Sequence, residues 1–389
     1  MKKTLLEGLR VLEISHAVAG PTASQILADY GAEVVKIERP DSGDIFRNLP
    51  GMGPAMFLAV NRGKKSVCVD LKTPEGLRIF FRLAGISDVI VENLGPGVAE
   101  SLGISYAKVR RINRRIVYCK VESFGAGPNE NVPAFDPVLQ AAAGIMSTTG
   151  FPPDRYVRAG VSVVDMSTGM HAANAILASL LAGRKGIEIR VPLFDAAAYF
   201  MSYWVALYDL ERKDTKPLGS THIFGAPYNL FKTRDGFVYI AIANDAAWKA
   251  FCKAFSFDEL LENKLYQTNS DRVKRKEELE TLLSKRLENF QADEISRKLK
   301  DTGVPYGKLN TAKSLLEDAH FLSRDILKSY SYGGRNFRTI VNPSVISGRR
   351  LFAAKSPPDL GADTSKILRS LLKMKPKEVS RLRKMRVIS

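Results

Sequence analysis

The segment Leu6–Asp44, LEGLRVLEISHAVAGPTASQILADYGAEVVKIERPDSGD, carries the pattern of a strand, a turn, a helix and a second strand. Leu9–Ser15 is a short apolar run of the kind found in buried parallel strands, and Glu33–Glu38 predicts the next strand. Pro21 occupies the position expected of a first helical residue, and Gly31 that of a helix end. The segment therefore predicts a βαβ unit in a parallel sheet.

The turn after the first strand, HAVAGP, contains a single glycine, Gly20, and lacks the G-x-G-x-x-G pattern of dinucleotide-binding proteins. The second strand ends on Arg39. Because ligands of open α/β sheets bind outside the carboxyl ends of the strands, an arginine at this place favours a ligand with phosphate groups. The missing glycine pattern indicates that this ligand is not NAD.

Strand and helix patterns alternate through residues 1–200, which predicts a parallel sheet covered by helices on both faces. Further strands are predicted at Ser66–Leu71, Asp88–Leu94 and Arg115–Val121, and Thr73 before Pro74 predicts the start of a helix. After about Gly219 the pattern changes. Residues 228–243 then predict an antiparallel hairpin that turns at an Asp-Gly pair.

Composition indicates an ordinary globular protein, with 389 residues, 45% of them hydrophobic and 25% charged. No apolar run approaches the roughly 20 residues that span a bilayer, and the start of the chain lacks a secretory signal, so we expect a cytoplasmic enzyme. Three cysteines and four histidines are too scattered to predict a disulfide framework or a metal site. Cys68 and Cys119 fall in predicted strands, so we expect them to be buried thiols.

The net charge of +17 raises the possibility of nucleic-acid binding. The basic residues are dispersed, however, and the densest runs lie in predicted amphipathic helices or at the carboxyl terminus. A charged, solvated surface therefore accounts better for the charge, with a smaller contribution from attraction of a polyanionic cofactor such as CoA. We expect neither a nucleic-acid nor a membrane partner.

Six further segments resemble, in order, those of the family III CoA-transferases, which include formyl-CoA transferase and the α-methylacyl-CoA racemases. They are VNRGKKSVCVDLKTPEG (60–76), DVIVENLGPGVAESLG (88–103), AFDPVLQAAAGIMSTTG (134–150), VVDMSTGMHAANAILASLLAG (163–183), LFKTRDGFVYIAIANDAAW (230–248) and VPYGKLNTAKSLLEDAHFLSRDIL (304–327). The first segment, quoted above, resembles the amino-terminal signature of the same family.

The resemblance implies an α/β fold with a discontinuous Rossmann-like large domain (1–200 and 330–389), a linker (201–224) and a small α+β domain (225–329). It also implies an interlocked homodimer. The substrates would be an acyl-CoA and a free carboxylic acid, with coenzyme A as substrate and product and with neither a metal nor NAD.

Asp165 is the best catalytic candidate. It follows the apolar run Val161–Val164 and precedes Ser167–Gly183, which predicts a buried helix containing His171. A carboxylate at such a strand-to-helix junction either caps the helix or serves as a preoriented nucleophile. The resemblance favours the nucleophile, because the family's catalytic aspartate occupies this position. It would attack an acyl-CoA thioester and then carry CoA as an aspartyl thioester.

The resemblance also implies a set of CoA-binding residues. They are His16, Ala17, Val18, Ala19, Arg39, Val69, Lys72, Asn93, Leu94, Val98, Phe135 and Asp136. The chain departs from formyl-CoA transferase at Val18, which replaces a glutamine, and at Pro133, which replaces a basic residue. Ser101 occupies a position that is often arginine in the family, so one phosphate contact is absent or supplied elsewhere.

Phe135 bears on the alternative function, racemisation of a 2-methylacyl-CoA. The racemases have a histidine at this position, and phenylalanine cannot accept a proton. Asp245 aligns with their second acidic base, but it would also make an ordinary helix N-cap. Asp136 is either a supporting carboxylate near Asp165 or a turn residue before Pro137. The glycine-rich loop of formyl-CoA transferase is not matched by LGSTHIFGAP (218–227).

Overall fold

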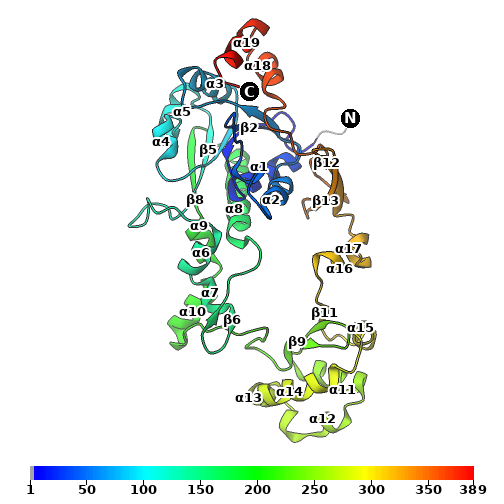
Figure 1. The fold of residues 1–389 in the computed structure, drawn as a ribbon. Helices are drawn as coiled ribbons and strands as arrows, with labels where there is room; N and C mark the ends of the chain where they lie inside the picture. Colours follow the sequence, from blue (N-terminus) through cyan, green and yellow to red (C-terminus); the bar gives the residue numbers. More distant parts are fainter. Residues whose placement is uncertain (1–3) are drawn as a thin grey trace. The chain divides into compact units, whose positions relative to one another are not determined.

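The computed structural model describes residues 4–389, which form two compact units (Figure 1). Unit 1 comprises the chain up to Ser147, Val157–Thr215 and Arg324–Ser389. Unit 2 comprises Thr148–Tyr156 and Lys216–Ser323. The segment expected as a linker, 201–224, contains the helix α10 (Ser202–Glu211), which belongs to unit 1.

Unit 1 is built on a six-stranded sheet with the order β3-β2-β1-β4-β5-β8, and every pair in it is parallel. The strands are β1 (Arg10–Ser15), β2 (Glu33–Glu38), β3 (Lys65–Cys68), β4 (Val89–Asn93), β5 (Val117–Glu122) and β8 (Ile187–Pro192). This order confirms the Rossmann-like sheet. Its topological switch point, where successive strands begin to be added on the other side of β1, lies between β1 and β4.

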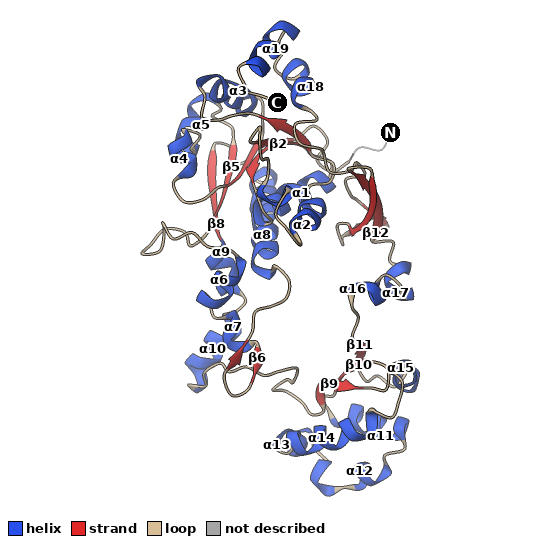
Figure 2. Cartoon of the chain, in the orientation of Figure 1, coloured by secondary structure: helices blue, strands red, loops and turns tan. Residues whose placement is uncertain are grey.

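Helices cover both faces of this sheet, as expected (Figure 2). One face carries α1 (Ala19–Asp29), α6 (Asp136–Ala142), α8 (Val163–Leu181) and α9 (Leu193–Tyr199). The other carries α3 (Pro74–Gly85), α4 (Val98–Leu102), α5 (Tyr106–Ile112), α18 (Thr364–Ser370) and α19 (Pro376–Lys384). Successive strand residues alternate between these two cores: Val89 and Val91 face α1 and α8, whereas Ile90 faces α3.

The remaining elements of unit 1 are short. They are α2 (Gly53–Val60), α7 (Ile145–Thr148), which ends at the boundary with unit 2, and the hairpins β12 (Leu327–Tyr332) with β13 (Arg335–Ile340) and β14 (Val345–Ile346) with β15 (Arg349–Arg350).

Unit 2 has the expected hairpin, β9 (Tyr228–Lys232) with β10 (Phe237–Ala241), extended by β11 (Tyr306–Lys308). Trp248 and Phe251 lie at the centre of its own apolar core. The other elements are β6 (Gly150–Phe151), β7 (Arg155–Tyr156), α11 (Asp245–Phe255), α12 (Asp258–Glu262), α13 (Asn269–Lys274), α14 (Lys276–Leu287), α15 (Ala292–Leu299), α16 (Ala312–Leu315) and α17 (Ala319–Ser323).

Two helix starts differ from the prediction. Helix α1 begins at Ala19, two residues before Pro21, because a proline is tolerated anywhere in a first turn whose N–H groups lack intrahelical partners. The run Val161–Val164 forms no strand, and α8 already begins at Val163. By contrast, the predicted cap at Thr73 is confirmed: its hydroxyl oxygen accepts from the Gly76 N–H at 3.0 Å.

No helix within residues 4–389 combines the length and the apolar character needed to cross a membrane. Cys68 and Cys119 are free thiols buried at β3 and in β5, as expected from their place in strands, and Cys252 is buried in α11.

Gly169 sets the contact between α8 and α1. A Cβ atom added there would lie 2.6 Å from the Thr22 Cβ and 2.7 Å from the Ala19 carbonyl oxygen. Because one of these atoms belongs to the backbone, rotation of a side chain cannot relieve the clash. Only glycine lets the two helices approach this closely.

We expect Gly169→Ala to lower the free energy of unfolding by about 1–3 kcal/mol, since the new methyl group separates α8 from α1. Gly85→Ala is the matched control, because a Cβ atom there meets its nearest neighbour, the Ile112 Cγ2, at an ordinary 3.7 Å. Urea denaturation of both variants measures the difference. Equal stabilities would show that the close approach is not needed.

Candidate active site

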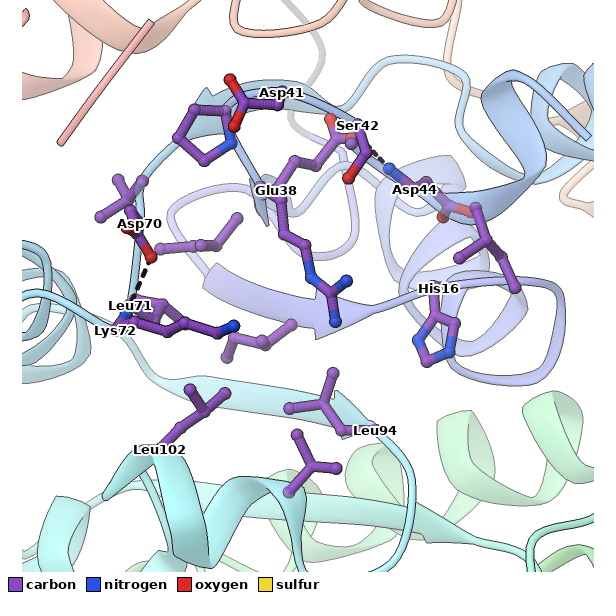
Figure 3. A pocket seen from close by; sticks show the side chains of 18 of the residues that line it. His16, Glu38, Asp41, Ser42, Asp44, Asp70, Leu71, Lys72, Leu94 and Leu102 are labelled. Carbon is purple, nitrogen blue, oxygen red and sulfur yellow. Dashed lines mark hydrogen bonds between the residues drawn. The ribbon is translucent and has the colours of Figure 1, made fainter. Parts of the chain in front are cut away.

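A pocket of about 410 Å³ opens at the carboxyl ends of the first four strands of unit 1 (Figure 3). It is lined by Ile14, Ser15, His16, Ile37, Glu38, Arg39, Pro40, Asp41, Ser42, Gly43, Asp44, Ile45, Val69, Asp70, Leu71, Lys72, Leu94, Val98, Ser101, Leu102 and Arg386. The topological switch point between β1 and β4 lies within this pocket, and open α/β sheets bind their ligands at such a point.

The pocket brings together six residues expected at a CoA site: His16, Arg39, Val69, Lys72, Leu94 and Val98. His16 and Lys72 stand at opposite ends in Figure 3. Burial lowers the pKa of His16, which favours its neutral imidazole. The Arg39 and Lys72 side chains are exposed and form no ion pair with another described residue, so their charge is available to a ligand.

The turn from β1 to α1 is held in an uncommon conformation. Ala17 has a φ of +64°, in the left-handed region that L-residues rarely adopt, and its N–H donates to the Asp44 Oδ1 at 3.2 Å. Ala17, Val18 and Ala19 do not line the pocket, and Val18 is buried against Phe46 and Phe57. The backbone of this turn, and not the Val18 side chain, is therefore presented at the strand end.

Asn93 ties this turn to the sheet. Its Oδ1 accepts from the Gly20 N–H at 3.2 Å, and its Nδ2 donates to the Val121 carbonyl oxygen at 3.0 Å. The side chain thus has a structural task that the sequence did not reveal, and it does not line the pocket.

Asp165 is the third residue of α8 and is half-buried. Its carboxylate accepts no hydrogen bond from another described residue, so of the two alternatives for Asp165 the helix cap is not the one found. The cap is Asp136, whose Oδ2 accepts from the N–H groups of Val164 at 2.8 Å and Asp165 at 3.0 Å. The first turn of α8 is thereby satisfied, and the Asp165 carboxylate stays free.

Asp136 is itself fixed. Its Oδ1 accepts from the Gln140 Nε2 at 2.5 Å, and the Gln140 Oε1 accepts from the Ala159 N–H at 2.8 Å. The buried carboxylate therefore braces the segment that leads into α8. Burial of Asp165, together with the negative charge of Asp136, raises the pKa of the Asp165 carboxyl to about 7.

Packing connects Asp165 to the turn beside the pocket. Gly169, one helical turn further along α8, lies against Ala19, and the Thr22 hydroxyl donates to the Met166 Sδ at 3.5 Å. The first two turns of α8 therefore pack against the start of α1, which follows the turn that His16 opens at the edge of the pocket.

Other predicted residues lie elsewhere. Phe135 is 65% exposed at the N-cap position of α6, outside the pocket. His171 is exposed and not a core residue, because that face of α8 is not covered within unit 1. In unit 2, Asn244 and not Asp245 caps α11, and the Asp245 carboxylate pairs with the buried Arg272 at 3.0 Å.

Sequence reasoning missed Asp44, which holds Ala17, and Arg386, which reaches the pocket from the other end of the chain. Gly43 and Asp44 form a turn-like pair after the second strand, which was a local signal for Asp44. No sequence pattern near Arg386 predicts that this residue lines the pocket. Within residues 4–389, no cluster of three or more His, Cys, Asp or Glu side chains has an arrangement suited to a metal ion.

The sequence model of CoA-transferase family III matches residues 6–364. This chain belongs to the family III CoA-transferases. Among its relatives is the human succinyl-CoA:glutarate CoA-transferase, 33% identical over 97% of this chain and 88% of the relative. The formyl-CoA:oxalate CoA-transferase of Streptomyces avermitilis is 31% identical over 90% of this chain and 92% of its own.

The fold of this family III CoA-transferase is also similar to a solved structure. A CAIB/BAIF family protein from Brucella suis superposes with a TM-score of 0.86 at 30% identity, over 95% of this chain and all of the other. These comparisons establish a CoA-transferase, with CoA thioesters as its substrates.

The raised pKa of Asp165 predicts a pH-dependent cost to stability in this CoA-transferase. The folded protein holds the proton up to about pH 7, whereas a free aspartate loses it near 3.8, so stability is lost as the pH rises between these values. We expect Asp165→Asn to be more stable than the wild type, with a gain that grows from pH 4 to pH 7 and is constant above. Denaturant titrations at pH 5 and pH 8 measure it, and an equal gain at both would contradict it.

Proposed function

We propose that this enzyme transfers CoA from an acyl-CoA to a free carboxylic acid through a covalent intermediate on Asp165. The observation that carries the proposal is a half-buried carboxylate with no hydrogen-bond donor of its own, on a helix turn capped by a second carboxylate. A side chain that only stabilised its helix would make the capping bonds itself. Asp165 leaves them to Asp136 and remains available as a nucleophile.

In the proposed reaction a carboxylate oxygen of Asp165 attacks the thioester carbonyl, and the carbon–sulfur bond breaks. The CoA thiolate then attacks the Asp165 Cγ of the resulting anhydride and releases the donor acid as a carboxylate. The enzyme now carries CoA as an aspartyl thioester. The acceptor carboxylate reverses both steps, which restores Asp165 and forms the new acyl-CoA without net uptake of protons.

The pocket is the proposed CoA site. Arg39 and Lys72 would bind phosphate groups, and the apolar side chains of Val69, Leu94 and Val98 would contact the adenine and pantetheine portions. The thiol end would pass His16 and the backbone of Ala17, Val18 and Ala19 toward Asp165. Asn93, Phe135 and Asp136 are proposed to support this end of the ligand.

Several relatives are named for succinyl-CoA, glutarate and oxalate. We infer that short dicarboxylic acids, carried as CoA thioesters or offered as free acceptors, are the first substrates to test. Racemisation is not proposed, because Phe135 offers no proton acceptor at the place where a base would be needed.

An interlocked homodimer remains part of the proposal. Its support is a run of uncovered apolar side chains on α8 and α10, including Leu181, which is 91% exposed, and Leu210, which is 84% exposed. Helix α10 has no buried residue within the single chain. Exposed apolar surface on this scale is typical of an interface between subunits.

Replacement of Asp165 by alanine is expected to abolish turnover and leave CoA affinity within about twofold, because the side chain acts on the acyl group and not on the nucleotide. With the wild type, hydroxylamine added after an acyl-CoA should convert Asp165 to a hydroxamate, which peptide mass spectrometry detects. Asp195→Asn is the control, since Asp195 is also the third residue of a helix but is exposed. Turnover by Asp165→Ala would refute the assignment.

On the acid side of its pH profile, kcat/KM should decline with a midpoint near pH 7. The reason is that only the ionised form of Asp165 attacks the thioester, and the pKa of Asp165 is about 7. Activity then falls about tenfold for each unit below that pH. Asp136→Asn removes the neighbouring negative charge, so its midpoint should move to lower pH. A pH–rate profile of both proteins tests this, and a wild-type midpoint near pH 4 would count against the nucleophile.

A further inference from the structure

Three cations from distant parts of the chain line one pocket: Arg39 after β2, Lys72 after β3, and Arg386 near the carboxyl terminus. None of the three forms an ion pair with another residue in the part of the chain that the structure describes. Two of the pocket's carboxylates are already neutralised, since Glu38 pairs with a buried arginine and Asp44 with a buried lysine. Asp41 and Asp70 remain beside the cations. The pocket thus presents unpaired positive charge that suits an anionic ligand.

The chain end is fixed against the segment that follows β3, and Figure 1 shows the carboxyl terminus close to α3. The Val387 carbonyl oxygen accepts from the Asp70 N–H at 2.8 Å, two residues before Lys72. Val387 and Ile388 are buried in the same core as Val69. Because the residues on either side are fixed in this way, the position of Arg386 at the pocket follows from the fold and not from a free tail.

Arg386 also has an unusual backbone, with a φ of +56° in the left-handed region. For a residue other than glycine, asparagine or aspartate, this conformation is uncommon and costs free energy. Its side chain is exposed and makes no hydrogen bond with another described residue. This φ belongs to the turn that ends α19, in which the Val387 N–H donates to the Leu382 carbonyl oxygen at 3.0 Å. The turn fixes the backbone of Arg386, and the unpaired guanidinium of this residue lines the pocket, which points to a role in binding.

We propose that Arg386 binds the phosphate groups of CoA, so that the last residues of the chain complete the CoA site. The proposal rests on the proposed location of CoA in this pocket. A guanidinium offers paired N–H donors that match phosphate oxygens. Ser101, which lines the same pocket, has no charge, and Arg386 supplies a cation that this position does not.

The test compares Arg386→Gln and Arg386→Gly with Lys384→Gln, by calorimetric titration with CoA, dephospho-CoA and pantetheine. Lys384 is exposed, lies two residues away and does not line the pocket, so its variant makes the same change in charge. We expect both Arg386 variants to bind CoA about tenfold more weakly, while Lys384→Gln stays within twofold. Arg386→Gly should fold at least as well as the wild type, because glycine accepts the positive φ.

In turnover, the KM for acyl-CoA should rise with kcat unchanged, and a pantetheine thioester should be used equally by all variants. If the Arg386 variants lose affinity for CoA but not for dephospho-CoA, Arg386 is assigned to the 3′-phosphate. If they lose affinity for both ligands, Arg386 is assigned to the diphosphate. Equal affinity of Arg386→Gln and Lys384→Gln for CoA overturns the inference. If Arg39→Gln and Lys72→Gln also leave CoA affinity unchanged, the proposed CoA location itself fails.

Discussion

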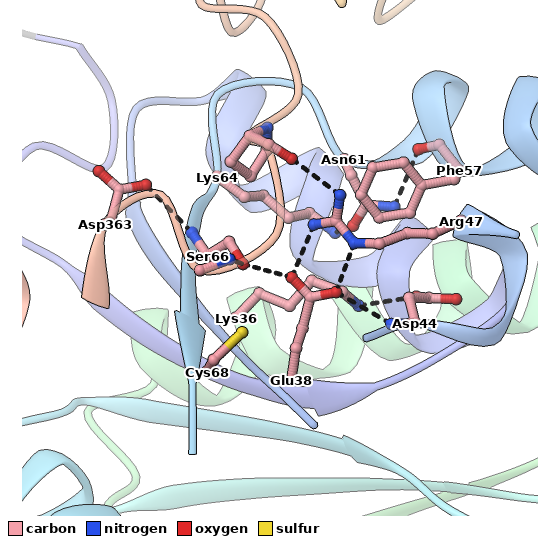
Figure 4. Close-up of polar contacts among 12 residues, drawn as sticks. Lys36, Glu38, Asp44, Arg47, Phe57, Asn61, Lys64, Ser66, Cys68 and Asp363 are labelled. Atoms are coloured by element: carbon pink, nitrogen blue, oxygen red, sulfur yellow. Dashed lines mark hydrogen bonds and ion pairs between the residues drawn. The ribbon is translucent and has the colours of Figure 1, made fainter. Parts of the chain in front are cut away.

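The buried ammonium group of Lys36 ties the end of β1 to the loop that follows β2. The Lys36 Nζ contacts the Asp44 Oδ2 at 2.9 Å (Figure 4). It also contacts the Glu13 Oε1 at 2.7 Å and the Ser15 carbonyl oxygen at 2.8 Å. Burial alone disfavours the charge, but the surrounding carboxylates raise the pKa of Lys36. Loss of one member would leave an uncompensated buried charge, at a cost of about 3–5 kcal/mol. Since Asp44 also holds the left-handed Ala17, the strand-end turn depends on this ion pair.

A second set of buried charges extends this constraint along the wall of the pocket. Glu38 accepts two hydrogen bonds from Arg47, at 2.7 and 2.8 Å, and a third from the Ser66 hydroxyl. Arg47 in turn donates to the Pro358 carbonyl oxygen at 3.0 Å and lies over the Phe57 ring. The loop between β2 and α2 is therefore fixed to β3 and to the returning carboxyl-terminal segment. Glu38 and Asp44 are already paired in this way, and within the described residues neither forms an ion pair with Arg39 or Lys72, whose charges remain available to a ligand.

Much of this arrangement follows from the sequence, because residues at the carboxyl ends of parallel strands must meet at one edge of the sheet. That rule, together with the family resemblance, predicts from the sequence that His16, Arg39 and Lys72 lie close together. It could not place contacts across long loops. The cap on α8 comes from 28 residues upstream, and the apolar run before Asp165 fits a short strand as well as a first helical turn. Arg386 lines the same pocket as Lys72 only because the chain end docks on the segment that follows β3, which no local pattern encodes.

The electrostatic destabilisation of the Asp165 anion has a chemical consequence. Burial and the charge of Asp136 both raise the free energy of the Asp165 anion, which is why its pKa is high. In the proposed reaction the anion becomes a neutral anhydride and then a neutral thioester. The first conversion removes the charge that the surroundings disfavour, and the second keeps the side chain neutral. Burial and the charge of Asp136 would therefore stabilise both covalent intermediates relative to the free carboxylate. A solvated aspartate with an ordinary pKa would lack this advantage. In the proposed reaction, the Asp136 carboxylate that caps α8 would position the nucleophile and would also favour its conversion to the neutral acyl forms.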